Sequence, residues 1–126
     1  MSTGTFAISI DFELYWGVRD TRRLEAYRSR LDGVRTAVPR MLDLFERNRV
    51  HATWATVGLL FCRDRDAALS AAPPERPGYE NLALCPYRYL EQSTELDGRY
   101  HFAPELVEMI AATPGQEVAT HTFSHY

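Results

Sequence analysis

The sequence is poor in cysteine, has no block of basic residues and contains no long hydrophobic run. Its two cysteines, Cys62 and Cys85, are far apart and outside any C-x-x-C pair, which favours two reduced thiols in a cytoplasmic protein over a disulfide. The 14 basic and 17 acidic residues are interleaved and leave a net charge of -3. This balance excludes the basic surface that nucleic-acid binding requires.

Membrane and export signals are also missing from the sequence. No segment approaches the roughly 18 apolar residues of a membrane-spanning helix. The first ten residues lack the basic start and the apolar stretch of a signal peptide. We therefore expect a cytoplasmic protein without a membrane span, acting on a substrate found in the same compartment.

The composition is that of a globular domain, with 45% hydrophobic and 25% charged residues. Apolar and β-branched patterns predict strands over 6–11 and 51–57. Between them, the spacing of apolar residues predicts a helix over 36–48, which begins near Thr36 because Pro39 fits only the first helical turn. Strand, helix and strand in this order form a βαβ unit, so we expect an α/β fold with parallel strands.

The second half of the chain contains a long insertion at about 64–102. Helical turns are expected over 64–72, whereas the proline-rich residues 71–78 cannot form regular structure. Loops of this length usually serve as lids or binding loops, so the insertion contacts a substrate or partner unless it is a surface elaboration without function. After it, the pattern predicts a helix over 103–112 and a third strand over 117–120.

Residues with metal-binding chemistry lie at the ends of the predicted strands. Asp11 and Glu13 close the first strand, and His121 and His125 follow the last one. The carboxyl ends of parallel strands share one side of the sheet, where ligands bind, so we expect these residues to meet. Two histidines and one carboxylate are a common ligand set of catalytic zinc sites, and the second acid would remain free as a base.

Alternation along a strand places Asp11 and Glu13 on one face and Phe12 on the other. Two neighbouring carboxylates are costly unless a cation neutralises them, which favours a divalent metal ion. We expect zinc, although the same ligands also suit cobalt. Tyr15 and Trp16 follow directly. Aromatic side chains beside carboxylates suit a sugar-binding cleft, so both are candidate substrate contacts, with a place in the core as the alternative.

Three stretches of the chain resemble the polysaccharide deacetylase family, the NodB-homology group of carbohydrate esterase family 4. Residues 9–13 read SIDFE where the family has TFDDG, and residues 51–58 read HATWATVG, similar to its ATFFVxG strand. Residues 120–125 read THTFSH and resemble its H-S/T-x-x-H motif. The resemblance implies a distorted (β/α) barrel, of which residues 1–126 would be the N-terminal part of a single domain, truncated after the second motif.

The resemblance also implies a reaction, namely the metal-dependent removal of an N-acetyl group from an acetamido sugar or polysaccharide. By position in the motifs, Asp11 is the general base, and His121 and His125 are metal ligands. Phe12 replaces the metal-binding aspartate of the family. Glu13 is then the natural substitute, because it reaches the same face with one extra methylene group.

Two alternatives stay open at this point. The altered first motif suits a related amidohydrolase acting on a small cyclic amide such as allantoin, and the tyrosine-rich insertion suits a non-catalytic glycan-binding relative. The arginine motif and the later general-acid histidine of the family have no counterpart in the 126 residues. We therefore expect an N-terminal fragment with little turnover by itself, and its oligomeric state is left open.

Overall fold

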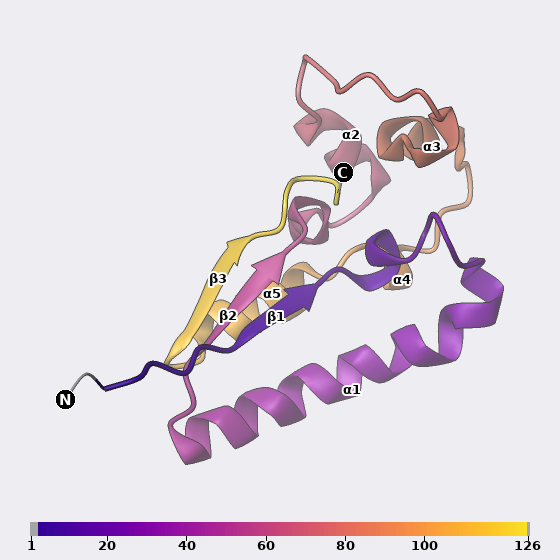
Figure 1. Cartoon of the computed structure of the whole chain (residues 1–126). Helices are drawn as coiled ribbons and strands as arrows, with labels where there is room; N and C mark the ends of the chain where they lie inside the picture. The colour runs from indigo at the N-terminus through magenta and orange to yellow at the C-terminus, as the bar shows by residue number, and fades with distance from the viewer. Residues whose placement is uncertain (1–2, 126) are drawn as a thin grey trace.

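The computed structural model describes residues 3–125, and its centre is a parallel sheet of three strands. In spatial order the strands are β1 (Ser9–Phe12), β2 (Ala52–Thr56) and β3 (Gln116–Thr120) (Figure 1). Asp11 pairs in register with Ala55, and Ala55 with Ala119. Because all three strands run the same way, their carboxyl ends lie at one edge of the sheet.

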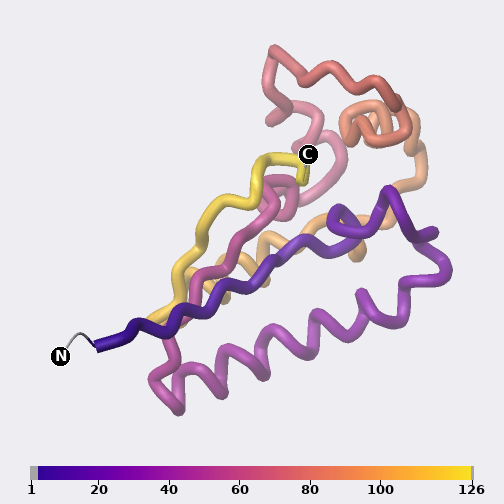
Figure 2. Tube along the Cα trace, in the orientation of Figure 1, coloured from indigo at the N-terminus to yellow at the C-terminus, as the bar shows by residue number. Residues whose placement is uncertain are grey.

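Two longer helices and several short helical segments lie in the connections between these strands. The long helix α1 joins β1 to β2, and α5 precedes β3. The full set is η1 (Leu14–Gly17), α1 (Leu24–Asn48), η2 (Gly58–Phe61), α2 (Arg65–Ala71), η3 (Leu82–Leu84), α3 (Pro86–Gln92), α4 (Gly98–His101) and α5 (Pro104–Ala112). The trace in Figure 2 shows the C-terminal turn beside the carboxyl ends of the strands, and the segment before β1 at the opposite end.

The two faces of the sheet differ in burial. Phe12 and Trp54 are buried on one face, where their rings meet edge to face at a centroid distance of 6.3 Å. They belong to the main hydrophobic core together with residues of α1 and α5, among them Leu42 and Ile110. Ser9, Asp11 and Glu117 on the other face are exposed, so the helices cover only one side of the described sheet.

The sequence-predicted strands and the helix before the last strand are confirmed, but the first helix is much longer than expected. It begins at Leu24 rather than near Thr36, and Pro39 lies inside it. The prediction was wrong because apolar residues also line its first half, where Leu31 is buried and Val34 partly buried in the core. Packing of this face offsets the backbone hydrogen bond that proline removes.

The insertion at 64–102 is folded into the body of the protein. Leu90 and Phe102 belong to the main core, and Tyr87 is also buried. Arg35 of α1 donates hydrogen bonds to the carbonyl oxygens of Arg99 and Phe102, at 2.7 and 2.9 Å. This segment is therefore part of the scaffold and not only a surface loop.

The α/β class predicted from the sequence is confirmed, and residues 3–125 form an open three-stranded sheet rather than a closed barrel. Cys62 and Cys85 are free thiols, as the sequence indicated. Across the described residues, none of the helices has the length and apolar character needed to cross a bilayer.

Candidate metal centre

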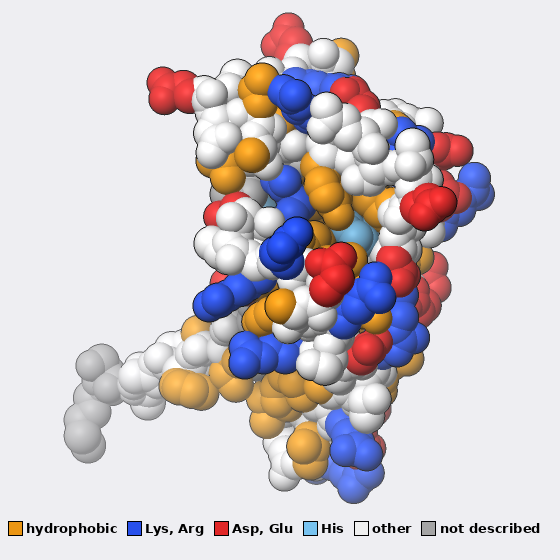
Figure 3. Space-filling model, turned by 90° about the vertical axis from the view of Figure 1, so that its right-hand side faces the viewer, with side chains coloured by type: hydrophobic (Ala, Val, Ile, Leu, Met, Phe, Trp, Pro, Cys, Tyr) orange, Lys and Arg blue, Asp and Glu red, His pale blue; other side chains and the backbone are white. Residues whose placement is uncertain are grey.

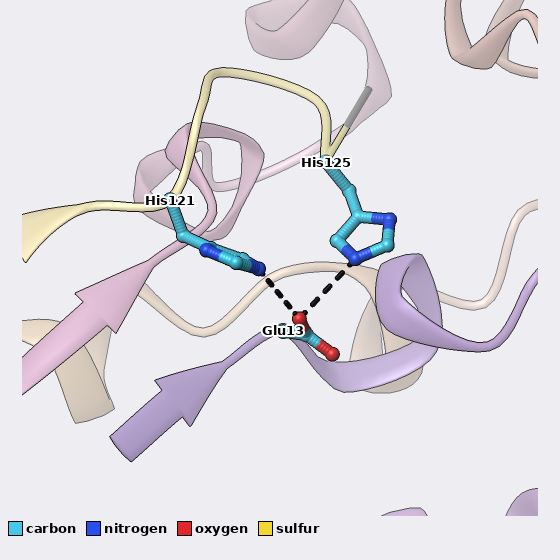
Figure 4. Close-up of side chains that lie close together, drawn as sticks. All are labelled: Glu13, His121 and His125. Carbon is cyan, nitrogen blue, oxygen red and sulfur yellow. Dashed lines mark ion pairs between the residues drawn. The ribbon is translucent and has the colours of Figure 1, made fainter. Parts of the chain in front are cut away.

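Glu13, His121 and His125 converge at the carboxyl edge of the sheet (Figure 4). The Glu13 Oε1 atom lies 2.8 Å from Nε2 of His121 and 3.2 Å from Nε2 of His125. The two imidazole rings are 5.4 Å apart between centroids and tilted by 55°. All three side chains are partly buried, so solvent reaches the point at which their polar atoms meet.

The dimensions of this group fit a divalent metal ion. Its three candidate ligand atoms lie within 4.8 Å of one another. In a tetrahedral zinc site with bonds of 2.0–2.2 Å, ligand atoms are separated by about 3.4 Å. Small outward movements of the three side chains would therefore admit zinc. The sequence predicted this convergence; the role of these residues as metal ligands stays a prediction.

The end of β1 positions Glu13. The Val57 amide donates to the carbonyl oxygen of Phe12 at 3.1 Å, and the Trp16 amide donates to the carbonyl oxygen of Glu13 at 3.2 Å. These bonds fix the backbone on both sides of the carboxylate, where the strand ends and η1 begins. The Glu13 side chain therefore extends from a turn whose backbone is held by hydrogen bonds on both sides.

The turn that carries the two histidines is fastened to the end of β2. The His121 amide donates to the carbonyl oxygen of Thr56, and the Gly58 amide donates to that of Thr122. A Cβ atom at Gly58 would lie 2.8 Å from Cδ2 and 3.0 Å from Cα of Phe123. Glycine at this position therefore allows close approach of the turn, a requirement that the sequence alone did not reveal.

Unusual backbone conformations gather around this group. Of the four non-glycine residues with positive φ in the described chain, one is a member of the group, His125 at 76°, and two directly follow a member, Leu14 at 50° and Thr122 at 58°. Such conformations cost about 1–3 kcal/mol each and often occur at functional sites. The fourth, Arg49, forms the left-handed cap that ends α1, an ordinary structural use.

Asp11, the predicted base, is placed differently from Glu13. It is exposed on the uncovered face of the sheet and pairs in register with Ala55. Within the part of the chain that the structure describes, it is not a member of the Glu13, His121 and His125 group. The structure therefore does not bring Asp11 into the group that it was expected to join, and its role as general base stays a prediction.

Tyr15 and Trp16, the predicted substrate contacts, are buried in the core. Trp16 is 1% exposed, and its indole Nε1 donates to the carbonyl oxygen of His101 at 2.7 Å. The Tyr15 hydroxyl donates to the carbonyl oxygen of Arg22 at 2.9 Å. The Tyr15 hydroxyl and the Trp16 indole thus have hydrogen-bond partners within the protein, which agrees with the alternative that both residues belong to the core. Substrate binding by these two residues stays a prediction.

His101, near the end of the insertion, contacts η1 and belongs to a buried hydrogen-bonded network. Its Nδ1 atom is 2.7 Å from the carbonyl oxygen of Asp97, and its Nε2 atom is 2.8 Å from the Tyr89 hydroxyl. The Asp97 carbonyl can only accept, so Nδ1 carries the proton and the Tyr89 hydroxyl donates to Nε2. Burial lowers the pKa of His101 and raises the pKa of Tyr89 to about 12, which keeps both neutral near pH 7.

A hollow of about 350 Å³ opens beside this network and is lined by aromatic and charged residues, including Tyr15, Tyr89, Arg28, Glu95 and His101. Figure 3 shows a face of the molecule on which basic and acidic side chains surround hydrophobic and histidine atoms. Arginines and carboxylates both line the hollow, so its charge favours neither anions nor cations.

Comparison of the chain with protein-family models, with curated proteins and with solved structures gives no match.

Proposed function

We propose that the protein is a metal-dependent hydrolase that removes an N-acetyl group from an acetamido sugar or polysaccharide. The observation that carries the proposal is the convergence of Glu13 with His121 and His125, from opposite ends of the chain. It matches the two-histidine, one-carboxylate ligand set of catalytic zinc sites. The sequence motifs around these residues, which resemble those of NodB-type deacetylases, point to the substrate class.

In this proposal the ligands and the base are separate residues. Glu13, His121 and His125 hold the ion, which when bound would polarise an amide carbonyl and make water more acidic. Asp11 takes the proton from the attacking water as general base. The small side chains of Ala55 and Ala119, in register with Asp11, leave room beside its carboxylate on the uncovered face of the sheet.

The same uncovered face supports the proposed barrel. In a (β/α) barrel one face of each strand points inward and the helices cover the other. Here α1 and α5 pack on one face only, and the other carries the small or polar residues Ser9, Thr53 and Ala119. We propose that these three strands form part of a distorted (β/α) barrel of the NodB type.

The test is zinc-dependent acetate release by the full product of the gene, with N-acetylglucosamine oligomers as substrate. Asp11→Asn should lower turnover by about 10²–10⁴ while zinc content stays at one ion per chain, because the base is lost and the ligands remain. Glu13→Gln should lower zinc content itself. Asp20→Asn, at another exposed acid, serves as the matched control and should leave both quantities unchanged.

Three outcomes would contradict the proposal. Hydrolysis of allantoin without acetate release would favour the cyclic-amide alternative. Glycan binding by the zinc-loaded protein without any hydrolysis would favour a non-catalytic relative. Loss of zinc in the Asp11→Asn variant would mean that Asp11 is a ligand rather than the base.

A further inference from the structure

We propose that Gly17 is a positioning residue of the metal centre, because its missing side chain leaves the space that the Glu13 carboxylate occupies. This inference rests on the proposed function, since it concerns how one of the proposed ligands is aimed. The predicted motifs did not include Gly17, which lies four residues after Glu13 at the end of η1.

The geometry at this position leaves no room for a methyl group. A Cβ atom built on Gly17 would lie 1.7 Å from Oε2 of Glu13 and 2.6 Å from its Cδ atom. Both distances are far shorter than any non-bonded contact between heavy atoms. The carboxylate of Glu13 therefore occupies the place that the side chain of any other residue at 17 would take.

The backbone at Gly17 does not itself call for glycine. Gly115 is the glycine for which a positive φ is recorded, and Gly17 is not in that region. In a helical turn without positive φ, alanine is usually more stable than glycine by about 0.5–1 kcal/mol. Local stability would thus favour alanine at 17, so the space needed by Glu13 is the physical reason for glycine.

The two carboxylate oxygens of Glu13 have different surroundings. Oε1 faces Nε2 of both His121 and His125, whereas Oε2 lies against Gly17. A methyl group at 17 would push on the flexible end of the Glu13 side chain and turn Oε1 away from the imidazoles. The same carbon would also lie 2.9 Å from Cβ of Glu13, which side-chain rotation does not move, so the backbone of η1 must shift slightly as well.

The two shortest contacts are with the carboxylate, so metal affinity should respond more strongly than stability. We expect Gly17→Ala to lower zinc affinity by 10- to 100-fold, the usual effect of losing a group that orients a ligand. The metal-free protein should lose little stability, because the gain from alanine in a helical turn offsets part of the backbone strain caused by the contact with Cβ of Glu13. Gly33→Ala is the matched control, because a Cβ atom at Gly33 meets nothing within 4 Å, and its zinc affinity should equal that of the wild type.

A double-mutant cycle tests whether Gly17 acts through Glu13. In a Glu13→Ala background the carboxylate is absent, so adding Gly17→Ala should change zinc affinity by less than about twofold. An equal loss of affinity in both backgrounds would overturn the inference, and so would an unchanged affinity in Gly17→Ala alone. The latter result, with zinc bound normally, would leave the proposed function intact.

A metal-free measurement keeps the inference testable even if the wild type binds no zinc. Long-range ¹H–¹⁵N NMR of the imidazoles should show changed Nε2 signals of His121 and His125 in Gly17→Ala and unchanged signals in Gly33→Ala. Unchanged signals in Gly17→Ala would show that Glu13 keeps its position, which would overturn the inference whatever the metal does.

Discussion

At the scale of single residues, Thr122 holds a conformation that β-branched residues rarely adopt. Its φ of 58° places it in the left-handed region between the two histidines, and its side chain is exposed. An L-residue pays about 1–2 kcal/mol there, whereas asparagine visits this region more readily. The strain is retained because the Thr122 carbonyl oxygen accepts a hydrogen bond from the Gly58 amide, and this bond holds the turn in place.

Replacing Thr122 by asparagine should therefore raise the free energy of unfolding by about 1 kcal/mol. The backbone hydrogen bond to Gly58 is kept, so zinc affinity should stay the same. Chemical denaturation of the metal-free protein measures the effect. Thr94→Asn, at an exposed threonine outside the positive-φ set, should give no gain. A loss of stability in Thr122→Asn would contradict the strain argument.

The candidate ligands could be predicted from the sequence because their chemistry is visible in residue type and spacing. Side-chain alternation indicated Glu13 rather than Phe12, and the structure places Phe12 in the core and Glu13 beside the two histidines. Gly17 and Gly58 could not be found in this way. Their role depends on atoms of Glu13 and Phe123 that approach them in space, and a single sequence does not show such contacts.

At the scale of elements, Pro39 lies in the interior of the 25-residue helix α1. Proline lacks the amide hydrogen that would form a hydrogen bond with the carbonyl oxygen of Arg35, and its ring crowds that carbonyl. Pro39→Ala should restore the hydrogen bond, while the unfolded chain gains some freedom. We expect the free energy of unfolding to rise by about 2 kcal/mol.

The control for this prediction is Pro104→Ala. Pro104 lies in the first turn of α5, where no intrahelical amide bond is lost, so its replacement should give no gain. Denaturant titrations of both variants make the comparison. A Pro39→Ala variant that is less stable than the wild type would mean that packing of the proline ring outweighs the missing hydrogen bond.

The start of α1 was difficult to predict from the sequence because its first half is rich in arginine. The mixed charges around Arg28 and Arg30 suggest a solvated loop or a short helix. In the structure their guanidinium groups lie over the rings of Tyr100 and Tyr27, at 5.5 and 5.2 Å from the centroids. Arginine is a good helix former and packs on aromatic faces. Charge density alone was therefore a poor guide to where this helix begins.

At the scale of the whole molecule, the parallel direction of the strands followed from the βαβ pattern, but the packing of the insertion did not. The residues that bring it into the core, such as Leu90 and Phe102, lie in short turns without a sustained period. Their burial depends on long-range contacts, for example between Arg35 and the carbonyl oxygens of Arg99 and Phe102. Composition and local pattern carry little information about such contacts.

Global stability should depend on pH through His101, a buried residue of the insertion that packs against η1. Burial holds its pKa below the ordinary value of 6.5, so between these two values the unfolded chain binds a proton that the folded protein does not. Stability is therefore lost as pH falls below about 6.5, with a slope of at most about 1.4 kcal/mol per pH unit from this group. Below the folded pKa this contribution becomes constant.

Chemical denaturation at pH 7.5 and pH 5.5 compares the wild type with His101→Asn. The variant should lose less stability on acidification, even though its stability at pH 7.5 is lower because the Tyr89 and Asp97 hydrogen bonds change. His51→Asn, at an exposed histidine, should show the same pH dependence of stability as the wild type. Equal pH dependence in His101→Asn and the wild type would contradict this assignment.

Glu13, His121 and His125 are proposed to bind one divalent ion at the carboxyl edge of the sheet. The most direct measurement is an anomalous difference map, recorded at the zinc absorption edge, of crystals grown with one equivalent of zinc. We predict one peak about 2.0–2.2 Å from Oε1 of Glu13 and from Nε2 of both histidines. No peak at this position, or a zinc ion bound by Asp11 in place of Glu13, would contradict the claim.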